Sequence, residues 1–249
     1  MADINKQAPL KPIYHEFGAL DVHSIFMTIQ GEGPFVGRKA LFVRLYGCNL
    51  QCPGCDTEYT DTIMTRMTTG QILKYSEAKT LRRGDLVVIT GGEPFRQNIA
   101  RVVRELCYEG YDVQIETNGV FSYYSERDIL TLLPREQWDK YGDLRLTKVV
   151  VSPKTSKISP AIAYRADAFK YVVKAGEVQP DGLPFHALEH KAKTPVARPP
   201  EGFKGPVYIQ PMDEQNEVLN KENMQATVEA VISHGHILCI QVHKIIGVE

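Results

Sequence analysis

The sequence has no apolar run of the roughly 18 residues that a membrane-spanning helix requires. Its first residues, MADINKQAPLKP, lack the apolar core of a secretory signal peptide, so we expect a cytoplasmic protein with no membrane partner. Neither sign of charge is in excess, because 29 basic residues balance 30 acidic ones and leave a net charge of -1. A nucleic acid partner held by a dominant electrostatic attraction is therefore not expected.

Internal repeats and low-complexity tracts are also absent, and 43% of the 249 residues are hydrophobic. This ordinary composition excludes a collagen-like fibre and a disordered chain. Residues 1–20 are polar and carry two prolines, so we expect an N-terminal extension followed by a single domain over 21–249. Within that domain, a proline-rich segment at about 175–206 has little periodicity and predicts a long loop between two strands.

Short apolar runs rich in β-branched residues recur along the chain, each bounded by Gly, Pro, Asp or Asn. They lie at 22–29, 40–46, 86–90, 112–117, 148–152, 169–173, 207–210 and 237–242. Several are apolar on both faces, which is typical of a parallel sheet covered by helices.

Helical periodicity is found between some of these runs. The stripes lie at 99–107 and 224–232, with a shorter one at 129–133 and a weak one at about 70–82, where Thr68 or Thr69 could cap the helix. Eight candidate strands with only three or four helices predict an α/β fold, and an open, partial parallel (β/α) barrel rather than a complete one.

Cysteine is scarce and unevenly distributed. The five residues are Cys48, Cys52, Cys55, Cys107 and Cys239, an odd number that argues against a disulfide framework. The first three form a C-x3-C-x2-C loop after a predicted strand, and three thiolates suit a [4Fe–4S] cluster with one iron left open. A structural zinc site would need a fourth ligand, which could only be the distant His15, His23, Cys107 or Cys239. Cys107 and Cys239 are expected to be buried packing residues.

The cysteine loop and the strand end LVVITGGEP (86–94) together resemble the radical S-adenosylmethionine (SAM) enzymes. The resemblance implies a partial barrel with the cluster at its mouth, where SAM binds the open iron and yields a 5′-deoxyadenosyl radical on reduction. Gly92 and Glu93 belong to the turn that binds the SAM amino group in this superfamily. Many such loops place an aromatic residue over the adenine just before the last cysteine. Here Gly54 stands there, so main-chain groups or Tyr59 are expected to contact the adenine.

A narrower resemblance, to the 7-carboxy-7-deazaguanine synthases, covers nearly the whole chain. It rests on QGEG (30–33), CDT (55–57), QPMD (210–213) and QVHK (241–244) in this order. It implies a carbon–nitrogen lyase of queuosine-type 7-deazapurine biosynthesis, which contracts the ring of 6-carboxy-5,6,7,8-tetrahydropterin to 7-carboxy-7-deazaguanine with release of ammonia. It also implies a magnesium ion, a homodimer, and a flavodoxin or ferredoxin as electron donor.

The resemblance assigns roles to residues by position. Arg44 would pair with the substrate carboxylate, which a planar guanidinium suits, and Glu32 and His243 would take part in catalysis. Substrate contacts are expected from Ile29, Gln30, Gly31, Arg44, Thr90 and the C-terminal carboxylate of Glu249. SAM contacts are expected from Gly54, Cys55, Asp56, Gly92, Glu93, Ser152, Pro153, Lys154, Gln210, Pro211, Met212 and Asp213. Cys48, Cys52 and Cys55 would bind the cluster and Thr57 the magnesium ion.

Two other functions stay open at this point. A radical SAM activating enzyme, which makes a glycyl radical on a partner protein, would share the cysteine loop and a similar glycine turn. A zinc-stabilised binding module without catalytic activity would need only the cysteines and a distant fourth ligand.

Overall fold

The computed structural model of the chain describes residues 5–55, 57, 64–78, 81–121, 147–188 and 195–248. Three residues singled out in the sequence, Asp56, Tyr59 and Glu249, lie outside the described residues, as does the apolar stripe at 129–133.

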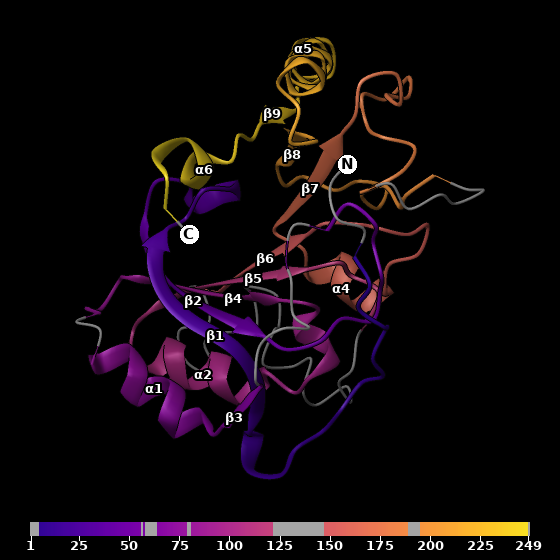
Figure 1. Ribbon diagram of the computed structural model, residues 1–249. Coiled ribbons are helices and arrows are strands. Elements are labelled where there is room, and N and C mark those ends of the chain that lie inside the picture. The colour runs from indigo at the N-terminus through magenta and orange to yellow at the C-terminus, as the bar shows by residue number, and fades with distance from the viewer. Residues whose placement is uncertain are drawn as a thin grey trace.

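In the described residues, nine strands form one sheet in the order β3-β1-β2-β4-β5-β6-β7-β8-β9. Their bounds are Leu20–Ile29 (β1), Lys39–Leu45 (β2), Thr65–Met67 (β3), Leu86–Gly91 (β4), Asp112–Thr117 (β5), Thr147–Val151 (β6), Ala168–Val173 (β7), Val207–Pro211 (β8) and Ile237–Leu238 (β9). The strands from β2 to β9 in this order are parallel, whereas β1 is antiparallel to both of its neighbours. The edge strands β3 and β9 lie at opposite ends of the order, so the described sheet curves without closing (Figure 1). The predicted open barrel is confirmed.

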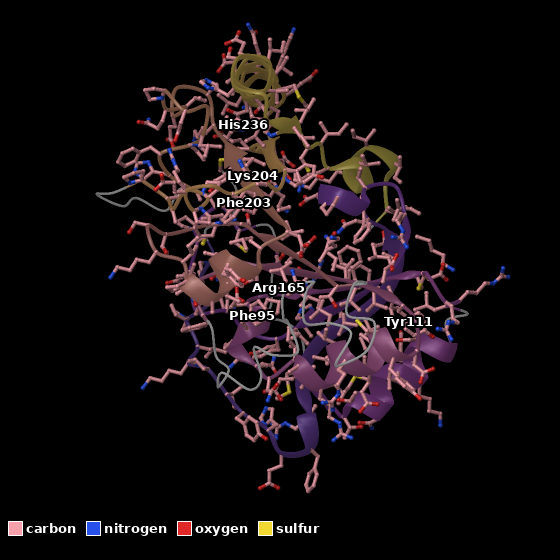
Figure 2. The ribbon with its side chains drawn as sticks, turned by 180° about the vertical axis from the view of Figure 1, so that it is seen from behind. Phe95, Tyr111, Arg165, Phe203, Lys204 and His236 are labelled. Atoms are coloured by element: carbon pink, nitrogen blue, oxygen red, sulfur yellow. The ribbon has the colours of Figure 1, made fainter. Side chains whose placement is uncertain are left out.

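The central strands are buried on both faces, as their continuous apolar runs predict. All four residues from Leu86 to Ile89 in β4 are fully buried. Val87 and Ile89 share the main core with Phe95 and Tyr111 (Figure 2), whereas Leu86 and Val88 pack with Ala40 on the other face. Such burial contributes roughly 1.5–3 kcal/mol for each large side chain. Parallel pairing brings the carboxyl ends of six neighbouring strands, β2 and β4 to β8, to one edge of the sheet, where polar residues follow the apolar runs.

Five helices are described: Thr69–Ala78 (α1), Ala100–Tyr108 (α2), Pro160–Arg165 (α4), Glu217–His234 (α5) and Val242–Ile246 (α6). Short 3-10 turns lie at Glu16–Gly18 (η1), Gly33–Phe35 (η2) and Pro94–Arg96 (η3). Helices α1 and α2 lie side by side against one face of the sheet (Figure 1). The stripe at 99–107 is confirmed, because Val102, Val103 and Leu106 of α2 are buried. The short strand β3 and the helices α4 and α6 were not predicted.

Helix α5 packs through a face that coincides only in part with its apolar stripe, since Thr227 is buried and Val231 packs against the core. Its buried residues are Asn223, Thr227 and Ala230, whereas Ile232 is 78% exposed. The Asn223 amide donates to the carbonyl oxygen of Met212 and accepts from the amide of Ala175. These hydrogen bonds satisfy loop groups beside β7 and β8, so a polar residue fixes how the helix lies.

The predicted strand at 237–242 is wrong beyond its first two residues. Strand β9 ends at Leu238, and Val242 begins helix α6, so His243 lies on a helix. The chain leaves the sheet here because the main-chain amide of Val242 donates to the carbonyl of Gly31 rather than to a strand.

The proline-rich segment has no named helix or strand in its described parts, 175–188 and 195–206. It is held by the Arg198–Asp181 ion pair and by a main-chain bond from Ala197 to Thr155. Among the helices that the structure describes, none combines the length and apolarity needed to cross a membrane.

Candidate active site

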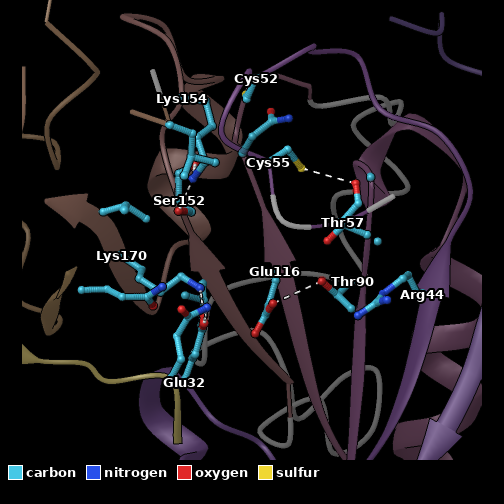
Figure 3. Close-up of a pocket in the computed structure, with 18 of the residues that line it drawn as sticks. Glu32, Arg44, Cys52, Cys55, Thr57, Thr90, Glu116, Ser152, Lys154 and Lys170 are labelled. Atoms are coloured by element: carbon cyan, nitrogen blue, oxygen red, sulfur yellow. Dashed lines mark hydrogen bonds and ion pairs between the residues drawn. The ribbon is translucent and has the colours of Figure 1, made fainter. Parts of the chain in front are cut away.

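A cavity of about 350 Å³ lies at the carboxyl ends of the parallel strands, in the size range of small-molecule sites. Its wall includes residues of β1, β2, β4 to β8 and α6. Figure 3 shows that the wall has two different ends. We call one the thiol end (Cys48, Cys52, Cys55, Ser152 and Lys154) and the other the charged end (Glu32, Arg44, Thr90, Glu116 and Lys170).

The three cysteines at the thiol end belong to the loop that follows β2. Burial, together with the nearby charges of Glu93 and the other two cysteines, raises the pKa of the Cys48 thiol to about 12. Burial also raises the pKa of Cys52. Without a metal Cys48 and Cys52 are therefore held as thiols, and binding a metal centre to them must release protons.

The donor set fits an iron–sulfur cluster better than a single metal ion. In the part of the chain that the structure describes, no three His, Cys, Asp or Glu side chains converge as the ligands of one ion would. Thiols spread along one loop can instead bind different irons of a cluster. Cys107 and Cys239 are buried elsewhere, beside Thr147 and Gly33, which confirms that they pack in the interior.

The glycine turn after β4 lies directly against the start of the cysteine loop. A side chain at Gly91, whose φ is +130°, would overlap the main chain of Leu45, and one at Gly92 would overlap that of Gly47. The amide of Gly92 donates to the Leu45 oxygen at 3.1 Å, and that of Glu93 to the Gly47 oxygen at 3.0 Å. The two glycines thus allow the backbones to approach closely and leave their own main chain facing the cavity.

The Glu93 side chain points into the protein interior beside the glycine turn. Its carboxylate is fully buried and accepts hydrogen bonds from Thr117 Oγ1 and from the amides of Phe95 and Asn118. Burial raises its pKa to about 7, although these hydrogen bonds oppose the rise. The carboxylate therefore links β4 to β5, and it is not on the cavity wall.

The charged end contains a largely buried ion pair between Glu32 and Lys170 of β7, each side chain 12% exposed (Figure 3). Gln241 Nε2 also donates to the Glu32 carboxylate, at 2.9 Å. Burial by itself would raise the pKa of Glu32, but the Lys170 ammonium and these hydrogen bonds lower it to about 2. Burial likewise opposes the charge on Lys170, yet Glu32 and Glu116 raise its pKa. Both partners are thus charged at neutral pH.

Glu116 of β5 connects three elements at this end. Its carboxylate accepts from Gln30 Nε2 at 3.0 Å, from Gln114 Nε2 at 2.8 Å and from Thr90 Oγ1 at 3.1 Å. Glu116 and Lys170 were not among the predicted site residues. The available signals were the polar end of the strand DVQIET, which carries Glu116, and a lysine inside the otherwise apolar strand AFKYVV.

Arg44 lies on the cavity wall beside Thr90, its register partner on β4. Its guanidinium carbon is 5.0 Å from the centre of the Phe26 ring, and that ring stacks on Phe42 at 5.4 Å. Two aromatic residues from β1 and β2 thus hold the cation at the cavity, which a lysine would fit less well.

Helix α6 brings the separate motifs together at the rim. A side chain at Gly31 would collide with the His243 ring, so glycine lets this helix lie over the QGEG segment. Lys244 Nζ pairs with Asp213 of the QPMD segment at 2.8 Å. That hydrogen bond, with others to the same carboxylate, lowers the pKa of Asp213 to about 2.

Gly54 lies against the proline-rich segment. Its amide donates to the carbonyl of Leu188 at 3.0 Å, and a Cβ at position 54 would lie 3.1 Å from Met212 Cε. Leu188 has a positive φ of 48°, which is costly for a leucine. It lines the cavity beside Gly54 and Met212.

Most site residues predicted from the sequence lie on the wall of this cavity. They are Ile29, Gln30, Glu32, Arg44, Cys48, Cys52, Gly54, Cys55, Thr57, Thr90, Gly92, Ser152, Lys154, Gln210, Met212, Asp213 and His243. Four predicted residues neighbour the wall without lining it, namely Gly31, Glu93, Pro153 and Pro211. Asp56 and Glu249 are outside the described residues.

Comparison with known proteins places this geometry in a family. The family model of the radical SAM superfamily matches residues 42–175, so the fold and the cysteine loop define a radical SAM enzyme. A 7-carboxy-7-deazaguanine synthase of Rhodospirillum rubrum is 36% identical over 237 residues, which cover 92% of this chain and 93% of that protein. The same enzyme of Rickettsia prowazekii is 35% identical over 240 residues, with 92% and 89% covered. The chain belongs to the 7-carboxy-7-deazaguanine synthase family.

A solved structure agrees with this assignment at the level of the fold. The crystal structure of QueE from Escherichia coli superposes with a TM-score of 0.63 at 22% identity, and the match covers 90% of this chain and 96% of that one.

Proposed function

We propose that this enzyme converts 6-carboxy-5,6,7,8-tetrahydropterin to 7-carboxy-7-deazaguanine and releases ammonia. The observation that carries the proposal is the single cavity with three thiols at one end and Arg44, Glu32, Glu116 and Lys170 at the other. Such a site can hold a radical-generating cofactor against a charged, hydrogen-bonding small molecule.

The charged end is proposed to bind the pterin. The Arg44 guanidinium, held over Phe26, is placed to pair with the substrate carboxylate in a two-point contact. The Glu116 and Glu32 carboxylates offer acceptors for the N–H groups of the pterin ring, while Thr90 and Gln30 hold Glu116 in position. Because Glu32 is ionised by its pair with Lys170, it acts as an acceptor rather than as a proton donor.

His243 and the main chain of Ile29–Gly31 complete the substrate end in this proposal. Helix α6 places the histidine over Gly31 at the rim, so the helix can close over bound substrate and exclude water. The C-terminal carboxylate of Glu249, which follows this helix in the sequence, is proposed to reach the substrate.

The thiol end is proposed to hold the cluster and SAM. Cys48, Cys52 and Cys55 would bind three irons, and when bound the cluster and SAM supply the hydrogen-abstracting radical. The main chain at Gly92, the Ser152–Pro153–Lys154 turn and the segment Gln210–Asp213 would orient SAM. Lys154 Nζ donates to Ser152 Oγ at 2.6 Å, so these two polar groups act together.

We propose that Leu188 and Met212 replace the aromatic side chain that Gly54 lacks. Both line the cavity next to Gly54, and the main chain of Leu188 is hydrogen-bonded to it. The adenine would then rest on an aliphatic surface that the proline-rich segment contributes.

A magnesium ion is proposed at Thr57, on the wall between the two ends. Figure 3 shows Thr57 between Cys55 and Arg44, where a metal could contact the substrate. One hydroxyl is a sparse ligand set, but Mg²⁺ commonly keeps waters and takes substrate oxygens. Its role would be to stabilise the anionic substrate while nitrogen leaves the ring.

The remaining assignments are a homodimer, a flavodoxin or ferredoxin as electron donor, and a cytoplasmic place in queuosine-type biosynthesis. The homodimer is supported by exposed apolar side chains of β9 and α6, which a second copy could cover. They are Ile237, Leu238, Ile245 and Ile246.

Anaerobic turnover tests the proposed function. The reconstituted enzyme is incubated with SAM, reductant, Mg²⁺ and the carboxytetrahydropterin, and products are identified by mass spectrometry. Formation of 7-carboxy-7-deazaguanine with ammonia in equal amount supports the proposal. Accumulation of 5′-deoxyadenosine without this acid overturns the proposed substrate but leaves the radical SAM assignment intact.

A further inference from the structure

The N-terminal segment has a definite place in the structure, although none of the motifs includes it. From residue 5 onward the segment runs along the side of the sheet to β1 (Figure 1, indigo). On the way, the Leu10 amide donates to the carbonyl of Cys48 at 2.7 Å, and the Asn5 amide donates to that of Pro53 at 3.4 Å. The segment therefore bonds to the main chain of the cysteine loop at two points.

Arg96 joins the same segment to the strand that leads into the loop. Its side chain is buried, with 3% exposed, and lies on η3 just after the glycine turn. Its guanidinium donates to the carbonyl of Lys11 at 3.0 Å and to that of Tyr46 at 2.8 Å, and its own carbonyl accepts from the amide of Ile13 at 2.8 Å. One arginine thus holds both the segment and the end of β2.

Gly47, the residue before Cys48, is enclosed between these groups. A Cβ at this position would lie 2.7 Å from Leu10 Cδ1 and 2.9 Å from Arg96 Nε, and its φ is +85°. Leu10 and Arg96 consequently fill the space behind the first cysteine, on the side away from the cavity. The cysteine loop therefore cannot shift away from the cavity without displacing Leu10 and Arg96.

We propose that Arg96 and residues 5–13, which we call the N-terminal brace, position the cysteine loop and keep water from its outer side. Arg96 and Leu10 are positioning residues in this account, since they act through Gly47 and Cys48. The bracing of the loop stands on the contacts alone, whereas the protection of a cluster rests on the proposed function. A buried guanidinium behind Cys48 would also favour the more negative, reduced cluster.

The bracing is tested first on the metal-free protein, by the rate at which iodoacetamide modifies each cysteine. Arg96→Met removes the side-chain donor from the Lys11 carbonyl and leaves the Tyr46 carbonyl only the longer bond from Gln97 Nε2, at 3.3 Å. Labelling of Cys48 should therefore rise about tenfold, the factor for one or two lost hydrogen bonds. Cys107 and Cys239 lie in the core and report on global unfolding in the same experiment. Their rates should not change.

Two further variants make the result specific. Arg101→Met is the matched control, because Arg101 also holds the N-terminal segment, at the Phe17 carbonyl, but lies away from the loop. It should leave labelling of Cys48 unchanged. Arg96→Lys keeps the charge and one donor and should restore part of the protection.

The cluster part of the proposal is tested on the reconstituted enzyme. Arg96→Met should bleach faster in air and show a lower cluster reduction potential, with Arg96→Lys between it and the native protein. Unchanged bleaching and potential, with raised labelling of Cys48, would overturn the cluster part and keep the brace. Neither readout depends on turnover, so failure of the proposed function is seen separately.

If Arg96→Met raises labelling of all five cysteines, the variant has unfolded and Leu10→Ala decides. This variant removes the isopropyl group whose Cδ1 lies against Gly47 and should raise labelling of Cys48 about threefold, a small local opening. The proposal is then overturned if Cys48 of Leu10→Ala is labelled at the native rate. It is also overturned if Arg96→Met stays folded and its Cys48 is labelled at the native rate.

Discussion

The two ends of the cavity are built in different ways. At the charged end, Arg44, Glu116 and Lys170 project from β2, β5 and β7, so strand register fixes where each lies. At the thiol end, the cysteines lie on a loop whose position depends on glycines and on main-chain hydrogen bonds from other segments. A damaged thiol end should therefore lose the cofactor, whereas a damaged charged end should keep it and lose the substrate.

The largest effect is expected at the thiol end. Cys52→Ala removes one of three cluster ligands, so iron, sulfide, brown colour and all turnover should be lost together. Iron and sulfide analysis after anaerobic reconstitution measures this. Cys107→Ala is the control, since that thiol is buried beside Thr147 and should not affect the cluster. A brown, active Cys52→Ala protein would contradict the cluster assignment.

Among substitutions at the charged end, Lys170→Met should lower the stability of the protein most. It leaves the buried Glu32 carboxylate without its cation, an imbalance that typically costs about 3–5 kcal/mol of stability. Urea unfolding of the metal-free protein measures the loss, and the double variant Glu32→Gln with Lys170→Met should recover much of it. A double variant no more stable than Lys170→Met would show that the pair's charge is not the cause.

The same pair has a defined pH dependence. The pKa of Glu32 is lowered to about 2 in the folded protein, so its stabilising contribution is complete above its ordinary pKa near 4.5 and is lost as pH falls toward 2. Stability of the native protein should thus show no Glu32 titration between pH 6 and 8. Glu93, whose pKa is raised to about 7, also makes the protein more stable as pH falls, so the variant is compared with the native protein at each pH. In Lys170→Met the pKa of Glu32 should rise, and the stability lost relative to the native protein should shrink as pH falls from about 7 to 5 because the carboxyl becomes neutral. A stability difference that does not change with pH would contradict the ion-pair account.

Arg44→Lys should reduce kcat/KM for the pterin by roughly 100-fold, because a lysine cannot make the planar two-point contact. Cluster content should stay native. Arg101→Lys, at an exposed helix position, is the matched control. If Arg44→Lys loses its cluster instead, the charged end also affects cofactor binding, and the two ends of the cavity do not act independently.

The smallest effect is expected where the proline-rich segment meets the loop. Gly54→Ala places a methyl group about 3.1 Å from Met212 and 3.4 Å from the Leu188 carbonyl. It should raise the KM for SAM about threefold, as a modest overpacking does, with the KM for the pterin unchanged. Equal changes in both constants would argue against an adenine contact at Leu188.

The sheet could be predicted from the sequence because its strands are apolar on both faces and are separated by clear turn signals. The positions of the motifs at strand ends followed from the same pattern. The packed face of α5 could be predicted only in part, because Asn223 is buried through hydrogen bonds that only the tertiary structure provides. The strand at 237–242 was predicted too long because ILCIQV has strand-like composition, although only Ile237 and Leu238 have register partners on β8.

The residues of the candidate site likewise fall into those that could be predicted from the sequence and those that could not. Residues in motifs, such as Cys48 and Arg44, could be assigned by resemblance, and the structure brings them to one cavity. Glu116 and Lys170 have no motif around them, so only their meeting with Gln30 and Glu32 shows that they belong to the site. The N-terminal segment likewise gains a role only through its contacts with the loop.

The most direct test of the central claim compares cofactor cleavage with product formation in one anaerobic assay. Native enzyme, Cys52→Ala and Arg44→Lys are each incubated with SAM, reductant, Mg²⁺ and the carboxytetrahydropterin, and 5′-deoxyadenosine and 7-carboxy-7-deazaguanine are quantified by mass spectrometry. If the two ends of the cavity act separately, the native enzyme should form the deazaguanine acid and Cys52→Ala should form neither compound. Arg44→Lys should form 5′-deoxyadenosine with little of the acid. Parallel loss of both compounds in Arg44→Lys, or no acid from the native enzyme, would contradict the account.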